Sequence, residues 1–126
     1  MELKLLIVDD SHLMRSRIAS QAMGCAGVRI VGEAADGERA LELFSDLEPD
    51  FVILDLHMPG MGGIEVLKAI RQRSSRARVC VLTNYDYPQY RRRCIDYGAQ
   101  YFLSKSGDFG RLPSIVAHEA AAAGLD

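Results

Sequence analysis

The chain has 126 residues, which is enough for one domain with a buried core. Hydrophobic residues make up 48% and charged residues 25%, the balance of an ordinary globular protein, and no apolar run reaches the ~20 residues that a membrane span needs. The net charge of −2 gives no reason to expect a nucleic-acid partner. Cys25, Cys80 and Cys94 have no metal-ligand spacing and are odd in number, which indicates reduced thiols. We therefore expect a single cytoplasmic domain over residues 1–126, without an output domain, a membrane segment or a nucleic-acid partner.

The predicted elements alternate between strand and helix along the whole chain. Strands are short apolar runs between turn residues, and helices are longer runs with apolar residues three or four positions apart. In chain order they are a strand 3–8, a helix from about 12 to 24, a strand 28–34, a helix 38–47, a strand 51–54, a helix 64–73, a strand 78–82, a helix 88–97, a strand 100–104 and a helix 113–123. Ser11 has the side chain to cap the first helix, and Pro88 suits the first turn of the fourth.

This order of elements predicts the fold class α/β. Strands joined by helical crossovers of this length run parallel, with helices on both faces of the sheet. We expect a doubly wound (βα)5 parallel sheet of the flavodoxin-like type, with strand order 2-1-3-4-5. The first, third and fourth strands are then central, which agrees with their being the most apolar runs, and the less apolar strand 28–34 lies at an edge.

Residues with charged or hydroxyl side chains stand at the ends of four of these strands. They are Asp9 and Asp10 after the first, Asp55 after the third, Thr83 after the fourth and Lys105 after the fifth. In such a sheet all of them lie at one edge, where open α/β sheets bind ligands. Three carboxylates in one crevice repel each other, and Mg²⁺ resolves that repulsion because it takes carboxylates, waters and phosphate oxygens as ligands. With an ammonium opposite Asp55 and a hydroxyl donor beside it, the set predicts a pocket for a phosphoryl group attached to a carboxylate nucleophile.

Each member of this set also has a purely structural interpretation. Asp9 and Asp10 suit a helix cap, Thr83 suits the interior of a strand, and Lys105 suits a solvated loop. The joint occurrence of the right chemistry at four strand ends favours the functional interpretation. The glycines of the loop 59–63 add to it, because they leave the backbone open to close approach by a ligand.

The chain resembles the receiver domain of two-component response regulators, the CheY-like family, over essentially its whole length. The matching segments are 6–11, 52–63, 81–83 and 102–105. This resemblance implies that Asp55 accepts a phosphoryl group from the phosphohistidine of a histidine kinase. It implies that Asp10, Asp55 and the backbone carbonyl of His57 coordinate Mg²⁺ directly, with Asp9 acting through a water molecule.

The resemblance also implies how the signal is passed on. Lys105 pairs with Asp55 and then with a phosphoryl oxygen, while Thr83 turns inward to the phosphoryl group and Phe102 moves with it. The surface formed by the helix 88–97, the strand 100–104 and the last helix then changes its affinity for a protein partner. The implied partners are a histidine kinase or a histidine phosphotransfer protein and one downstream protein, and the chain itself is a monomer or a weak phosphorylation-dependent dimer. Phosphorelay to a histidine phosphotransfer protein and an unphosphorylated scaffold remain as alternatives.

Three positions depart from the family pattern. Ser106 stands where proline often follows the lysine, Phe102 stands where tyrosine is commoner, and Asn84 is larger than the usual residue. A haloacid-dehalogenase-like phosphatase is a different possibility, but it needs a second acid two residues after the nucleophile, where this chain has His57. A flavodoxin is disfavoured because Asp9 and Asp10 would repel a flavin phosphate. We therefore expect a signalling switch and not an enzyme acting on external substrates.

Overall fold

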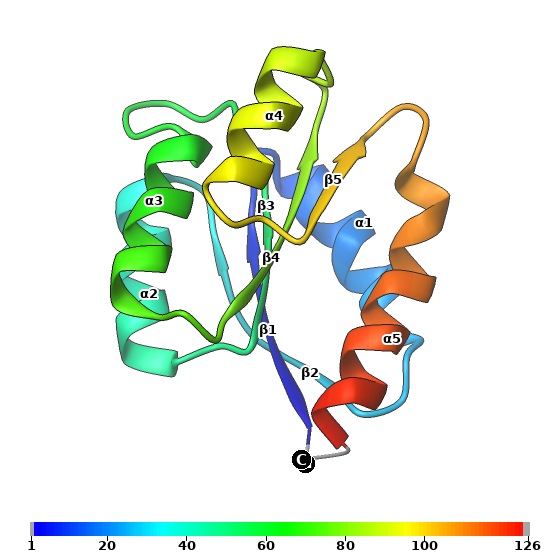
Figure 1. The fold of residues 1–126 in the computed structure, drawn as a ribbon. Helices are drawn as coiled ribbons and strands as arrows, with labels where there is room; N and C mark the ends of the chain where they lie inside the picture. Colours follow the sequence, from blue (N-terminus) through cyan, green and yellow to red (C-terminus); the bar gives the residue numbers. More distant parts are fainter. Residues whose placement is uncertain (1, 125–126) are drawn as a thin grey trace.

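A parallel five-stranded sheet with the order β2-β1-β3-β4-β5 forms the centre of the protein in the computed structural model, which describes residues 2–124 (Figure 1). The strands are β1 (Leu3–Val8), β2 (Val28–Ala34), β3 (Phe51–Leu54), β4 (Arg78–Thr83) and β5 (Tyr101–Ser104). The helices are α1 (His12–Met23), α2 (Gly37–Leu47), α3 (Gly63–Arg73), α4 (Pro88–Asp96) and α5 (Leu112–Gly124). The predicted fold class and strand order are both confirmed.

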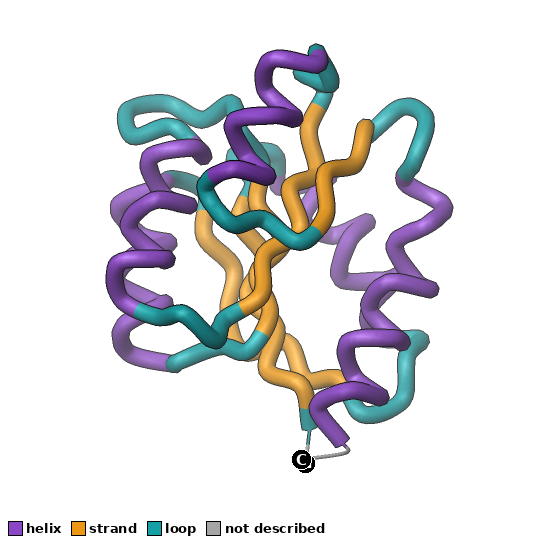
Figure 2. Tube along the Cα trace, in the orientation of Figure 1, coloured by secondary structure: helices purple, strands orange, loops and turns teal. Residues whose placement is uncertain are grey.

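Helices cover both faces of the sheet (Figures 1 and 2). Helices α1 and α5 lie on one face, and α2 and α3 lie on the other, with α4 beside α3. In β3, Val52 and Leu54 pack toward α2 and α3, whereas Phe51 and Ile53 pack toward α1 and α5. Because successive strand residues point to opposite faces, a strand covered on both sides must be apolar throughout. This is why β3 is an unbroken apolar run and β1 and β4 are nearly so.

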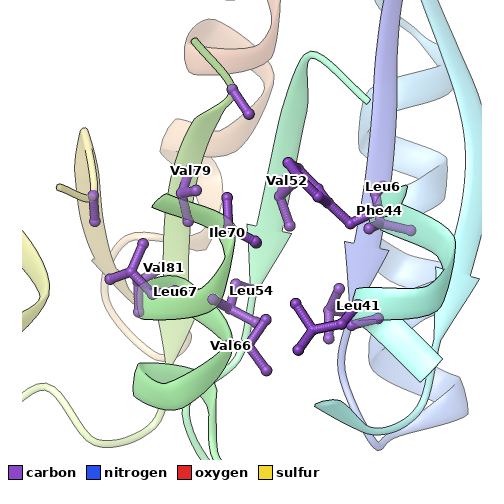
Figure 3. Close-up of a cluster of buried hydrophobic side chains, with 14 of the residues drawn as sticks. Leu6, Leu41, Phe44, Val52, Leu54, Val66, Leu67, Ile70, Val79 and Val81 are labelled. Carbon is purple, nitrogen blue, oxygen red and sulfur yellow. The ribbon is translucent and has the colours of Figure 1, made fainter. Parts of the chain in front are cut away.

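The packing between the sheet and helices α2 and α3 forms one of the two hydrophobic clusters found in the described residues (Figure 3). Strand residues from β1, β3 and β4 meet helix residues at the spacing of one helix face. The labelled members are Leu6, Leu41, Phe44, Val52, Leu54, Val66, Leu67, Ile70, Val79 and Val81. Burying one such aliphatic side chain stabilises the fold by about 1.5–3 kcal/mol. Packing on both faces therefore holds the strands in place, and with them the C-terminal edge of the sheet that carries the polar residues.

Side-chain caps set the starting points of two helices. Ser11 Oγ accepts a hydrogen bond of 3.2 Å from the Met14 N–H, so the predicted cap of α1 is confirmed. Asp36 Oδ1 accepts one of 2.8 Å from the Arg39 N–H and caps α2. Each cap stabilises its helix by about 1 kcal/mol, and the first holds α1 directly after the acidic pair at the end of β1.

The predicted boundaries differ from the structure by a residue or so, as is usual at fraying ends. Strand β5 begins at Tyr101 instead of residue 100, and α5 begins at Leu112, one residue before the predicted start. A short 3₁₀ helix, Phe109–Arg111, occupies part of the segment that leads into α5. Within residues 2–124, no helix has the length and apolar character that crossing a bilayer requires.

Candidate functional site

Three carboxylates meet at the C-terminal edge of the sheet, as the sequence predicted. One oxygen each from Asp9, Asp10 and Asp55 lies within 4.8 Å of the others. The backbone explains the convergence, because the Asp55 N–H donates to the carbonyl of Val8 at 2.9 Å and so continues the β1–β3 ladder beyond the strands. Asp9 and Asp55 are almost fully buried, and Asp10 is exposed.

Lys105 lies between two of these carboxylates and is nearer to Asp9 than to Asp55. Its Nζ is 2.7 Å from Asp9 Oδ2 and 3.4 Å from Asp55 Oδ2. The resemblance implied a pairing with Asp55 alone, so the structure adds Asp9 as the closer partner. All three side chains are at most 9% exposed, and water therefore screens these attractions weakly.

The environment of Asp55 disfavours an unaccompanied negative charge. Asp55 Oδ1 accepts a hydrogen bond of 2.8 Å from the Leu56 N–H. Burial raises the pKa of the Asp55 carboxyl, the Lys105 ammonium opposes that rise, and the Asp9 carboxylate adds to it. The net pKa is above the ordinary value, so a single ammonium does not fully compensate the buried acids.

The donor set fits a hard divalent cation. Asp9 Oδ2 is buried, and within residues 2–124 its one close polar partner is the Lys105 ammonium, at 2.7 Å. The other oxygen of Asp9 accepts from the Ser11 N–H at 2.9 Å, so Oδ2 faces cationic partners alone. Asp10 makes no ion pair in the described part of the chain and supplies an exposed carboxylate to the same cluster. Carboxylate oxygens of this kind are the ligands that Mg²⁺ prefers.

Thr83 ends β4 inside the site and keeps a hydrogen to donate. The side chain is fully buried, and Oγ1 accepts a hydrogen bond of 3.0 Å from the Tyr85 N–H. A hydroxyl has two acceptor positions and one donor, so the Thr83 O–H can still point to a ligand oxygen. The Lys105 N–H donates to the carbonyl of Thr83 at 2.9 Å, which ties the strand ends of β4 and β5 together.

The loop after Lys105 is organised by residues that the sequence reasoning did not single out. Ser104 Oγ accepts from the N–H groups of Ser106 and Gly107 at 3.2 and 3.3 Å, and Asp108 Oδ2 accepts from the Ser104 N–H at 2.9 Å. The Lys105–Ser106 bond is trans, like every peptide bond in the described residues. The sequence signal for this loop was a serine at the end of a buried strand with an aspartate four residues later. Both residue types accept hydrogen bonds from nearby backbone N–H groups.

Gly63 has a different role from the one expected of the loop glycines. A Cβ on Gly63 would lie 2.2 Å from the carbonyl oxygen of Asp55 and 2.7 Å from Cα of Leu56. The Gly63 N–H donates to the carbonyl of Leu56 at 3.0 Å. This glycine therefore admits the chain's own backbone, which folds back on Asp55, and not a ligand.

Aromatic side chains form one rim of the site. The His57 ring lies 5.0 Å from the Tyr85 ring, and Tyr85 makes an edge contact with Tyr90 at 6.4 Å. The His57 side chain is exposed. These rings line a cavity of about 290 Å³ between α3 and α4, to which Lys68 and Arg93 also contribute.

Phe102 is buried beside α4, where Arg91 covers it. Only 3% of the Phe102 side chain is exposed. The Arg91 guanidinium carbon lies 5.2 Å from the ring centroid, and Arg91 Nη2 donates to the Phe102 carbonyl at 3.2 Å. This contact was not predicted from the sequence.

Comparison with known proteins agrees with this geometry. Residues 5–117 match the response regulator receiver domain family. The chain is similar to the nitrate/nitrite response regulator protein NarL of Escherichia coli (strain K12), with 32% identity over 118 residues that cover 94% of this chain and 54% of that protein. It is similar to the signal receiver domain assigned to NarL of Mycobacterium tuberculosis, with a TM-score of 0.86, 32% identity and coverage of 95% of this chain and 97% of that chain. It is also similar to a chain of the CheX–CheY–BeF3–Mg²⁺ complex of Borrelia burgdorferi, with a TM-score of 0.76, 30% identity and coverage of 90% and 88%.

The chain spans about half the length of the Escherichia coli NarL protein. The expectations of a single domain without an output segment and without a nucleic-acid partner therefore stay predictions about these 126 residues. The roles assigned to individual site residues also stay predictions. The three cysteines are free thiols, and their cytoplasmic setting likewise remains a prediction.

Proposed function

Because the chain belongs to the response regulator receiver domains, which are signalling switches, we propose that it accepts a phosphoryl group on Asp55 from the phosphohistidine of a histidine kinase or a histidine phosphotransfer protein. One observation carries this proposal. The Asp55 carboxylate is buried at the strand-end edge, with two further carboxylates and the Lys105 ammonium around it. Asp9 shares these neighbours, so the choice of Asp55 as the acceptor also relies on its position in the segment 52–63 that matches the family pattern.

Asp55 acts as the nucleophile. The Leu56 N–H holds Oδ1 at 2.8 Å and so orients the carboxylate. An oxygen of Asp55 attacks the phosphorus, an O–P bond forms, and the N–P bond of the donor breaks with its electron pair returning to the imidazole. The burial that makes ionised Asp55 costly also excludes water, which protects the resulting acyl phosphate.

The proposed Mg²⁺ ligands are Asp10, Asp55 and the backbone carbonyl of His57, with Asp9 acting through a water molecule. The burial of Asp9 Oδ2, which has only the Lys105 ammonium beside it in the described residues, and the spacing within the acidic cluster support this assignment. When bound, Mg²⁺ neutralises charge on the phosphoryl oxygens during transfer. The similar Borrelia burgdorferi complex contains Mg²⁺ together with BeF3.

Lys105 and Thr83 stabilise the phosphorylated state. Lys105 moves its ammonium from the two carboxylates to a phosphoryl oxygen, and Thr83 donates its free hydroxyl hydrogen to another. Phe102, which pairs with Val81 in the β4–β5 ladder two residues before Thr83, is coupled to this movement, and the inward Thr83 favours the buried position of its ring. The surface of α4, β5 and α5 then changes its affinity for a downstream protein.

Onward transfer of the phosphoryl group to a histidine phosphotransfer protein is the second candidate for the output. It requires the same acceptor chemistry, and the exposed rim beside Asp55 leaves the site open to a donor or acceptor histidine. A phosphatase that turns over external substrates is disfavoured, because the position two residues after Asp55 is occupied by His57, whose ring contacts Tyr85. We place the protein in the cytoplasm as a monomer or a weak phosphorylation-dependent dimer.

The direct test is intact-mass analysis after incubation with acetyl phosphate and Mg²⁺. We expect one phosphoryl adduct on the wild type, none on Asp55→Asn and none when EDTA replaces Mg²⁺. Asp46→Asn is the matched control, because Asp46 is an exposed acid on α2 away from the cluster, and it should form the adduct normally. An adduct that persists in Asp55→Asn, or its absence from the wild type, would contradict the proposal.

A further inference from the structure

Helix α4 is held to the sheet by few interactions. Its one buried residue is Cys94, and the rest of the helix is exposed or half-buried. Within residues 2–124, the hydrogen bond from Arg91 to the Phe102 carbonyl is the one side-chain hydrogen bond from α4 to β5. A helix with so little buried surface is easily displaced, so this polar contact matters more than it would on a helix with a larger core face.

Arg91 makes both of its contacts to the same residue. The guanidinium covers the Phe102 ring at 5.2 Å from the centroid, where the negative face of the ring attracts a cation. The same guanidinium donates from Nη2 to the Phe102 carbonyl at 3.2 Å. The ring contact depends on the rotamer of Phe102, whereas the carbonyl contact depends only on the backbone. Departure of the ring from its buried position therefore breaks the first contact and leaves the second available.

We propose that Arg91 is a positioning residue that holds the Phe102 ring in its buried position and α4 against β5. The inference rests on the proposed function, in which the inward turn of Thr83 toward a phosphoryl group favours the buried Phe102. Phenylalanine has no hydroxyl to form a hydrogen bond of its own. In this chain the Arg91 guanidinium of α4 instead contacts the face of the Phe102 ring. Arg91 and the phosphoryl group then favour the same conformation.

The neighbouring arginines provide an internal comparison. Arg92 is exposed and makes no ion pair or side-chain hydrogen bond in the described part of the chain. Arg93 lines the cavity between α3 and α4, and in the described residues no hydrogen bond or cation–π contact joins it to Phe102. Arg91 thus differs from its neighbours by its contacts, and a general effect of positive charge on α4 would appear equally in Arg92 variants.

Linkage gives the direction of the effect. If phosphorylation favours the buried ring, then a residue that favours the buried ring also favours phosphorylation. A cation–π contact at an exposed site corresponds to a change of about two- to fivefold in the conformational equilibrium. The rate follows the fraction of molecules with the buried ring, so Arg91→Gln should slow phosphorylation by acetyl phosphate by up to about fivefold, and Arg92→Gln should not change it.

The first experiment examines the unphosphorylated protein. Amide hydrogen exchange over residues 88–96 and the NMR signals of the Phe102 ring are measured in the wild type, Arg91→Gln and Arg92→Gln. We expect exchange over this segment to accelerate by about two- to fivefold and the ring signals to shift in Arg91→Gln only. Identical behaviour of the two variants would overturn the inference, whether or not Asp55 accepts a phosphoryl group.

The second experiment separates positioning of the ring from simple structural support. Initial rates of adduct formation are measured for Arg91→Gln in the wild-type background and in the Phe102→Leu background, which keeps the carbonyl contact and removes the ring. The rate should fall in the first background and stay unchanged in the second. An equal fall of the rate in both backgrounds would overturn the positioning role, and so would faster hydrogen exchange with no change in rate. Either result would mean that Arg91 only supports the structure of α4. Absence of any adduct from the wild type would instead contradict the proposed function.

Discussion

The ammonium of Lys105 lies 2.7 Å from Asp9 Oδ2, closer than to the proposed acceptor Asp55 at 3.4 Å. Lys105 is thus the single side-chain cation that the described residues place against two buried carboxylates. Its removal leaves both of them without a compensating charge. An unpaired buried charge costs far more than a solvated one, because the protein interior screens it poorly.

Lys105→Met should therefore lower the free energy of unfolding by about 3–5 kcal/mol in buffer with EDTA. Mg²⁺ should restore part of this loss, because a bound cation supplies positive charge to the same cluster and binds only the folded state. Urea denaturation with and without Mg²⁺ measures both effects. Lys68→Met is the matched control, since Lys68 is exposed and contacts the ring of Tyr97 instead of an acid. A loss as small as that of the control would show that Lys105 does not compensate the buried acids.

We expect the free energy of unfolding of the metal-free protein to depend on pH because of Asp55. Its folded pKa is raised above the ordinary value of 3.8, mainly by burial, so the folded protein binds this proton more tightly than the unfolded chain does. Stability is then lost as pH rises from the ordinary pKa to the folded pKa, where Asp55 ionises at a cost. In EDTA, Asp55→Asn should be more stable than the wild type at pH 7, and the two should converge below about pH 4.

The measurement is urea denaturation between about pH 3.5 and 7.5, with Asp46→Asn as the control. Asp46 is exposed, so its variant should follow the wild type throughout. Addition of Mg²⁺ should stabilise the wild type more than Asp55→Asn, because the variant loses a proposed ligand. A variant less stable than the wild type at neutral pH without metal would contradict this account of the site.

The buried carboxylate of Glu119 on α5 links two strands, because it contacts Tyr101 of β5 and Arg78 of β4. Glu119 is 3% exposed, accepts a hydrogen bond of 2.7 Å from the Tyr101 hydroxyl and forms an ion pair with Arg78. Tyr101→Phe removes one donor from this buried acid and should lower the free energy of unfolding by about 1.5–3 kcal/mol. Tyr87→Phe, at a ring that is 56% exposed, should change it little.

The same pair of variants also tests the location of the function. Tyr101 begins β5, at the opposite end of the strand from the acidic site, so Tyr101→Phe should still form the phosphoryl adduct at the wild-type rate under native conditions. Thermal or urea denaturation and intact-mass kinetics provide the two readouts. A loss of adduct formation without a loss of stability would mean that α5 is coupled to Asp55 more directly than the contacts indicate.

The sequence was sufficient for the fold and for the members of the acidic cluster because both follow from local patterns. Alternation of apolar runs with amphipathic segments dictates a parallel sheet, and the topology of such a sheet brings its strand ends to one edge. The contact of Arg91 with Phe102 and the nearness of Lys105 to Asp9 were not predictable in this way. They depend on side-chain rotamers and on the exact placement of a weakly buried helix, which no spacing rule specifies. Gly63 was recognised as a loop residue, but its reason is a tertiary contact with the backbone of Asp55.

Gly63 offers the sharpest test of how the loop positions the acceptor. A methyl group at this position would lie 2.2 Å from the carbonyl oxygen of Asp55, a backbone atom that cannot move without displacing the carboxylate. Gly63→Ala should lower the free energy of unfolding by about 1–3 kcal/mol, as overpacking does, and should also slow adduct formation. Gly110→Ala is the control, because a Cβ there meets no atom within 4 Å. Urea denaturation measures the stability of the variant, and intact-mass kinetics measure its rate of adduct formation. If Gly63→Ala loses stability but keeps the wild-type rate, the loop relaxes away from Asp55. If it loses both stability and rate, the close approach of Gly63 to the Asp55 backbone is what holds the acceptor in place.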